Sequence, residues 1–161
     1  MSDLSFENTE KRIEELVKEL LVVPLSQPAF DLSTTPANLD DLGVLTRRVS
    51  NVIIRFRSID YDNAKINPKA KCFPRQNTAN YTILVNNNNL RSHLDVYAIA
   101  QAIIYKLRGQ IVARDTDNNI VESSPIYISN AKFVDYDEIK SCHKMEIVLS
   151  FDYVEAYSRK Q

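Results

Sequence analysis

The residues with the right chemistry for a metal site lie in one short acidic segment. Asp115, Asp117 and Asn119 have the D-x-D-x-N spacing that opens a calcium-binding loop. Such a loop needs a glycine at its sixth position for the sharp turn and a bidentate glutamate at its twelfth, but this sequence has Ile120 and Ile126 there. We therefore expect a polar hairpin turn at this place and no metal.

The other candidates for chemistry are two cysteines and two histidines. Cys142 and His143 are adjacent, and neighbours on a strand point to opposite faces of a sheet, so they cannot meet as nucleophile and base. His93 falls in the first turn of a predicted helix, where we expect a structural or surface role. The only glycines, Gly43 and Gly109, provide neither a phosphate-binding loop nor a nucleophile elbow. We expect no enzymatic activity, no catalytic residue and no cofactor.

A basic segment is the best candidate for contact with a partner. Residues 61–78 show no periodicity and carry Lys65, Lys69, Lys71 and Arg75, with no acidic residue after position 62. The pattern predicts a long basic loop. Three interpretations remain open: a surface loop without a partner, a contact with an acidic protein surface, or a small nucleic-acid-binding module whose basic and two aromatic residues follow a phosphate backbone.

Length and composition set the class of protein. The 161 residues fit one domain, and the contents of 44% hydrophobic and 25% charged residues are typical of a soluble globular protein. The net charge of −1 gives no global field that would attract nucleic acid or an anionic membrane. The sequence begins without the basic and apolar pattern of a signal peptide and has no apolar stretch of membrane-spanning length. We expect a single cytoplasmic domain over residues 1–161.

Two helices follow from the apolar periodicity. Residues 1–38 are predicted to form a helix over residues 8–22 and then an irregular crossing segment punctuated by prolines. A second helix over residues 92–108 ends before a glycine.

The second helix is apolar on more than one side. Beyond its main apolar stripe it carries Tyr97, Ile104 and Tyr105. This is more apolar surface than one sheet can cover, so these three residues are the candidate subunit interface.

The strands are predicted from alternation and β-branched content. They cover residues 49–59, 81–85, 126–133 and 145–157, and residues 115–118 form the turn of a further hairpin. The expected fold class is α+β: a mixed β-sheet packed against two main α-helices, with a β-rich C-terminal half.

Three stretches of sequence carry a resemblance to a known family. They are a strand with an arginine-rich end (VIIRFRS, residues 52–58), a strand that runs into a polar Leu-Arg turn (NNLRSH, residues 88–93) and a helix that closes with LRG (residues 107–109). In these features, in size and in element order, the chain resembles the tail-terminator proteins of Mu-like contractile phages and related contractile injection systems. The resemblance covers roughly residues 52–157.

The resemblance implies a non-enzymatic structural protein. Tail terminators form a ring, of six copies, on the last disc of the tail tube, stop the growth of tube and sheath, and present a surface to the head or to a cap. The implied partners are other copies of the chain, the tube and sheath proteins and, in a phage, the head connector, with DNA contact only where the channel carries a genome and no membrane insertion. Assembly would take place in the cytoplasm, before the protein becomes part of a virion or of a headless phage-tail-like particle. In that setting, Lys65, Lys69, Lys71 and Arg75 are expected to meet the next ring or to line the channel.

Overall fold

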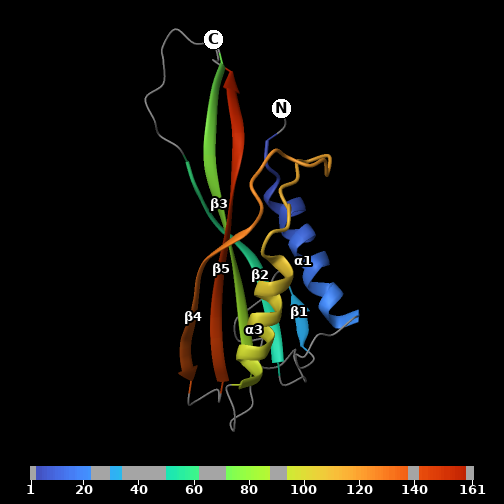
Figure 1. The fold of residues 1–161 in the computed structure, drawn as a ribbon, viewed down its shortest axis with the longest axis vertical. Helices are drawn as coiled ribbons and strands as arrows, with labels where there is room; N and C mark the ends of the chain where they lie inside the picture. Colours follow the sequence, from blue (N-terminus) through green and yellow to red (C-terminus); the bar gives the residue numbers. More distant parts are fainter. Residues whose placement is uncertain are drawn as a thin grey trace.

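Two helices pack on one face of a mixed five-stranded sheet (Figure 1). The strand order is β1-β2-β3-β5-β4, in which β1 runs parallel to β2 and all other neighbours are antiparallel. The elements are α1 (Phe6–Val22), β1 (Asp31–Ser33), β2 (Ser50–Asp60), β3 (Cys72–Asn87), α3 (Leu94–Leu107), β4 (Tyr127–Asp137) and β5 (Cys142–Ser158). This computed structural model describes residues 3–22, 30–33, 50–61, 72–87, 94–137 and 142–158. The α+β fold class expected from the sequence is confirmed.

Helix α1 begins two residues before its predicted start because a serine caps it. The Oγ atom of Ser5 accepts a hydrogen bond from the backbone N–H of Asn8 at 3.2 Å, as an N-cap residue does. The apolar side of the helix packs in the core, where Leu16 and Val17 are buried. Leu21 lies at the edge of this apolar side and is 39% exposed. Neither described helix has the length and apolar composition of a membrane span.

Helix α3 ends where its sequence predicts. Gly109 has φ of +89°, in the left-handed region that glycine enters without strain. Its backbone N–H donates to the carbonyl of Ile126 at 3.0 Å, which ties the helix end to the segment entering β4. The predicted start of this helix at Ser92 lies outside the described residues.

The core lies between the helices and one face of the sheet. Alternate residues of β2, β3 and β5 reach it, and the largest buried side chains of these strands include Ile54, Tyr81, Ile83, Leu149 and Phe151. The Tyr81 hydroxyl is satisfied by the carbonyl of Phe6 at 3.0 Å. Buried residues therefore alternate along the central strands, as the sequence pattern predicts.

Two sequence predictions are corrected in the sheet. The predicted basic loop over residues 61–78 is wrong from Cys72 onward, because β3 begins there and pairs with β5. The predicted irregular crossing contains β1, a three-residue strand too short to give a pattern. The rest of the predicted loop, residues 62–71, lies outside the described residues.

The predicted hairpin around residues 115–118 is confirmed as a turn but not as a pair of strands. Single bridges join Arg114 to Ile120 and Leu4 to Asp115. The Asp115 carboxylate accepts from the backbone N–H groups of Asp117 and Asn119, both at 2.9 Å. All three residues with calcium-loop spacing thus take part in the hydrogen bonds that hold the turn together.

Strands β3 and β5 run past the rest of the sheet (Figure 1). The pairing of β2 with β3 stops at Asp60 and Thr78, and on the other side the segment before β4 pairs with β5 only as far as Val154. Beyond these points residues 72–75 pair with residues 155–158. We call these eight residues the β3–β5 arm.

Candidate interaction surface

The residues predicted to contact a partner are only partly placed by the structure. Lys65, Lys69 and Lys71 lie outside the described residues. Arg75 belongs to β3 and stands opposite Glu155 of β5, within the β3–β5 arm. Arg75, which the sequence analysis predicts in a loop, is therefore a strand residue.

Two of the three candidate interface residues present their side chains to solvent. Tyr105 is 73% exposed and Tyr97 is 38% exposed, although both are large aromatic residues on α3. Ile104 is half-buried and packs against the core. The two tyrosines thus offer more surface to a partner than the isoleucine does.

The edge strand β4 adds apolar surface that sequence reasoning missed. Phe133 is 41% exposed and Val134 is similarly exposed. The rings of Tyr97 and Phe133 pack edge to face, with centroids 6.4 Å apart. We call the three aromatic residues Tyr97, Tyr105 and Phe133 the α3–β4 surface. Exposed aromatic residues of this kind are enriched at protein–protein interfaces.

The sheet face away from the helices carries a network of hydroxyl, amide and carboxylate groups. Thr78 donates to Asp152 Oδ1 at 2.7 Å, and the hydroxyl of Tyr127 donates to the same oxygen at 3.2 Å. Partial burial raises the pKa of Tyr127, and the Asp152 carboxylate raises it further. A tyrosine whose proton is held in this way is a hydrogen-bond donor at neutral pH. The network is therefore suited to fixing strand positions.

A second part of the same network is centred on Asn80. Its side-chain amide donates to Ser58 Oγ at 3.2 Å and to Asp60 Oδ2 at 3.0 Å, and its carbonyl oxygen accepts from Ser150. Ser150 also contacts Ser129 of β4. Four strands are thus joined by side-chain hydrogen bonds across this face.

A groove of about 470 Å³ runs between α1 and the turn at residues 114–118. Arg12 and Arg114 line it together with Glu15 and Asp117, and Arg12 is paired with Glu15 at 3.0 Å. Partial burial lowers the pKa of Arg114, and the nearby positive charge of Arg12 lowers it further. The walls of the groove thus carry charges of both signs.

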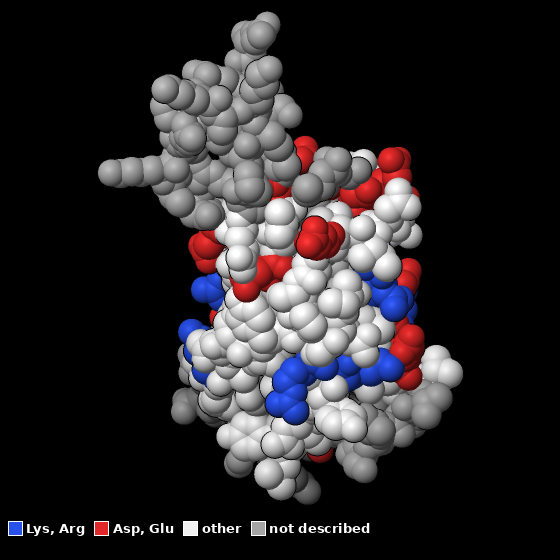
Figure 2. Space-filling view, turned by 45° about the horizontal axis from the view of Figure 1, so that its top comes forward, with Lys and Arg blue, Asp and Glu red and all other residues white. Residues whose placement is uncertain are grey.

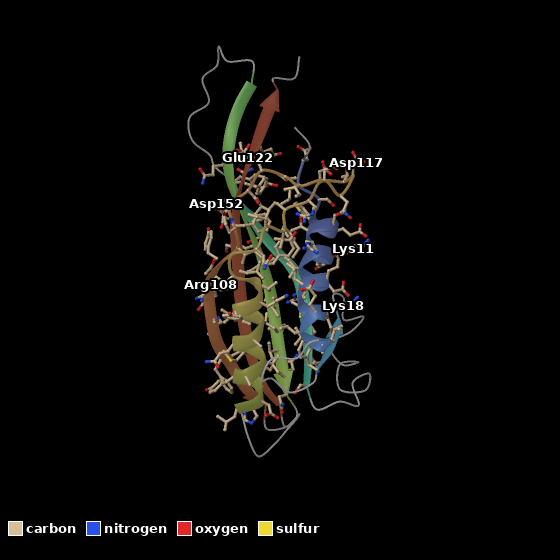
Figure 3. The ribbon with its side chains drawn as sticks, turned by 45° about the vertical axis from the view of Figure 1, so that its right-hand side comes forward. Lys11, Lys18, Arg108, Asp117, Glu122 and Asp152 are labelled. Atoms are coloured by element: carbon tan, nitrogen blue, oxygen red, sulfur yellow. The ribbon has the colours of Figure 1, made fainter. Side chains whose placement is uncertain are left out.

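The described surface carries charged side chains of both signs. In Figure 2, a broad uncharged region lies between acidic residues toward the top and basic residues lower down. Figure 3 shows Lys11 and Lys18 along α1, Arg108 just beyond α3, and Glu122 and Asp152 near the base of the β3–β5 arm. Mixed charge around an uncharged region suits contact with another protein better than contact with a uniformly anionic polymer.

The comparisons with known proteins identify the fold. No protein-family model and no curated protein matches the sequence. A chain of the "Virion of native gene transfer agent (GTA) particle" has a similar structure, with a TM-score of 0.56 and 10% sequence identity over 91% of this chain and 94% of that chain. A second solved chain has a TM-score of 0.52 and 15% identity over 95% of this chain and 94% of that chain. The chain thus shares the fold of a protein found in a gene transfer agent particle.

Proposed function

We propose that this chain is a non-enzymatic structural protein of a phage-tail-like particle, and specifically a tail terminator. In this role it forms a ring, of six copies, on the end of the tail tube and sheath, stops their growth and provides the surface that faces the head or cap. The observation that carries the proposal is the similarity to the gene transfer agent chain, which extends over 94% of that chain. The sequence resemblance to tail terminators points the same way independently.

The exposed apolar residues support self-association. Each subunit of a closed ring needs two different contact surfaces, one for each neighbour. The α3–β4 surface supplies large aromatic groups for one of them, since Tyr97, Tyr105 and Phe133 all retain substantial exposure. A ring contact that buries these groups removes apolar area from water and is stabilised by it.

The basic residues are assigned to attachment. In the proposed role, Lys65, Lys69 and Lys71 bind an acidic surface of the tube, of the sheath or of the next ring. Charged groups of this kind speed encounter and select the partner, and the apolar contacts hold the complex.

The test is assembly on a tube. Purified protein is mixed with polymerised tube protein of the same particle and examined by electron microscopy and native mass spectrometry. We expect six-membered rings at tube ends and tubes that stop growing when the protein is added. Tubes that grow to the same lengths with and without the protein, and that carry no rings, would contradict the proposal.

A further inference from the structure

The groove between α1 and the turn at residues 114–118 has walls that hydrogen bonds hold to each other. The side-chain amide of Asn8 on α1 donates to two carbonyls of the turn, at 2.8 and 3.2 Å. The backbone N–H of Arg114 donates to Thr9 Oγ1 at 3.1 Å, and its carbonyl accepts from the backbone N–H of Ser5 at 2.8 Å. The shape of the groove is therefore fixed within the chain, as is typical of a preformed binding site.

Two arginines line the groove from opposite walls. Arg12 belongs to α1, and Arg114 begins the turn. The two guanidinium groups are near enough that the positive charge of Arg12 lowers the pKa of Arg114, after the larger effect of partial burial. Lys11, which also lines the groove, is already paired with Glu7 at 2.8 Å. Two like charges held near each other repel, so an anion placed between the arginines is attracted by both.

Neither arginine has all its donors in use within the part of the chain that the structure describes. A guanidinium group has five N–H donors. Arg12 donates from Nη1 to Glu15, whose side chain is 63% exposed, whereas the Nε atom of Arg12 is buried and has no hydrogen-bond partner. Arg114 donates from Nη1 to the carbonyl of Ala113 at 3.0 Å and forms no ion pair with a described residue. Because an exposed ion pair such as that of Arg12 with Glu15 contributes little, both arginines remain available to a further carboxylate.

The acidic residues of the groove indicate which kind of anion it can take. Glu15 and Asp117 are both part of the lining, and Figure 3 shows Asp117 on the turn. These two carboxylates repel further negative charge. A nucleic acid carries a phosphate on every unit, whereas a polypeptide can present one carboxylate between uncharged neighbours. The volume of about 470 Å³ accommodates such a side chain.

We propose that this groove binds a single carboxylate side chain from a segment of a partner protein, with Arg12 and Arg114 donating to its oxygens from the two walls. Arginine suits this role because its planar group of donors matches the two oxygens of a carboxylate. The residues beside that carboxylate in the partner are not acidic, since Glu15 and Asp117 repel further negative charge. The groove shares no residue with the α3–β4 surface. The inference therefore goes beyond the proposed ring contact, and its test needs neither rings nor tubes.

An NMR titration tests the site. The probe is a capped peptide with one glutamate between alanines, added to the isotope-labelled chain at pH 6.5 and low salt. We expect it to shift the Nε–Hε signals of Arg12 and Arg114, with saturation in the millimolar range. The Arg12→Gln and Arg114→Gln variants should each bind the peptide about tenfold more weakly, because each loses a hydrogen bond between charged groups. The two arginines belong to different elements, so either variant tests the site if the other does not fold.

Two further variants make the titration specific to the groove. Asp117→Asn removes a repelling carboxylate and should bind the peptide about two- to threefold more tightly, a gain that damage to the fold does not produce. Lys18→Gln is the matched control, because Lys18 lies on the same helix outside the groove and is paired with Glu14 at 3.1 Å. This control removes the same charge as either arginine variant and should keep the wild-type affinity.

Several outcomes would overturn the proposal. The arginine signals do not move in the titration, or a glutamine version of the peptide shifts them equally. The arginine variants keep the wild-type affinity, or Lys18→Gln loses as much affinity as they do. Inorganic phosphate or a short single-stranded DNA binds more tightly than the peptide, which would assign the groove to a free anion or to nucleic acid. The proposed function would stand after any of these results, because none of them involves a ring.

Discussion

Tyr97 of α3 and Phe133 of β4 pack edge to face, with ring centroids 6.4 Å apart and ring planes at 81°. The pair links the helix layer to the edge strand of the sheet. Yet Tyr97 keeps 38% and Phe133 keeps 41% of its surface exposed. Because the two rings contact each other and keep much of their surface exposed, they are suited to the subunit contact of the proposed ring.

Removing both aromatic side chains should abolish assembly at a moderate cost in stability. An aromatic pair contributes about 0.5 to 1.5 kcal/mol beyond its buried area, so a Tyr97→Ala, Phe133→Ala double variant should unfold in urea with a free energy lower by about 1 to 3 kcal/mol. Native mass spectrometry should then show monomers where the wild type shows rings. Ile120, which is 70% exposed on the turn, provides the control through Ile120→Ala. If the double variant assembles into subunit rings at the same protein concentration as the wild type, the subunit contact lies elsewhere.

The helices were predictable because their signals are local. The apolar period of α1 and the glycine after α3 depend on residues within a few turns, and both helix ends that the structure describes at Val22 and Leu107 agree with the sequence to within one residue. The exposure of Tyr97 and Tyr105 was also expected, since apolar residues beyond the main stripe of a helix cannot all reach one sheet. Phe133 was missed because alternation marks a strand without showing which strand lies at an edge.

The first part of β3 could not be predicted, because the interactions that form it are not local. Its residues include Pro74, Gln76 and Asn77, which are not typical of strands, and they form one because β5 pairs with them from some 80 residues away. Asn77 is fully buried there, and its amide donates to Glu155 at 2.8 Å. A pairing partner so distant in the sequence leaves no local pattern.

Leu16 should carry much of the stability of the α1 packing. It is 3% exposed in the core, and truncations of buried leucine cost about 2 to 5 kcal/mol, so Leu16→Ala should lower the free energy of unfolding by that amount. Leu21, on the same helix and 39% exposed, should lose under about 1 kcal/mol as Leu21→Ala. Urea unfolding of the two variants makes the comparison. Equal losses would mean that α1 does not pack as described.

Glu10 should make the fold pH-dependent. Its carboxylate accepts from the backbone N–H of Phe56 at 3.1 Å, but burial raises its pKa above the ordinary value of 4.5, and the charges of Glu14 and Glu7 raise it further. Since the folded state holds this proton more tightly than the unfolded state, the contribution of Glu10 to stability is favourable at low pH and is lost as the pH rises through the raised pKa. A Glu10→Gln variant keeps an acceptor oxygen without the charge.

Melting temperatures between pH 3 and 8 check this expectation. Glu10→Gln should melt higher than the wild type at pH 7, and the difference should shrink as the pH falls below about 4, where the wild-type carboxyl is protonated in both states. The exposed Glu122, changed to Gln, should show no such gain. A Glu10→Gln variant less stable than the wild type at pH 7 would show that the hydrogen bond to Phe56 outweighs burial.

The three lysines of the basic segment should act in attachment and not in folding. Replacing Lys65, Lys69 and Lys71 with glutamine should change the free energy of unfolding by under about 0.5 kcal/mol, as surface charges usually do. The same variant should bind tube ends more weakly than the wild type, and the gap should be widest at low salt, where the Debye length is longest and charge attraction is least screened. Sedimentation with tubes across a salt series measures this, with a Lys11→Gln, Lys18→Gln variant on the exposed side of α1 as the matched control. Equal binding by the triple variant at every salt concentration would remove these lysines from the tube contact, and the α3–β4 surface would then be the surface to test for attachment.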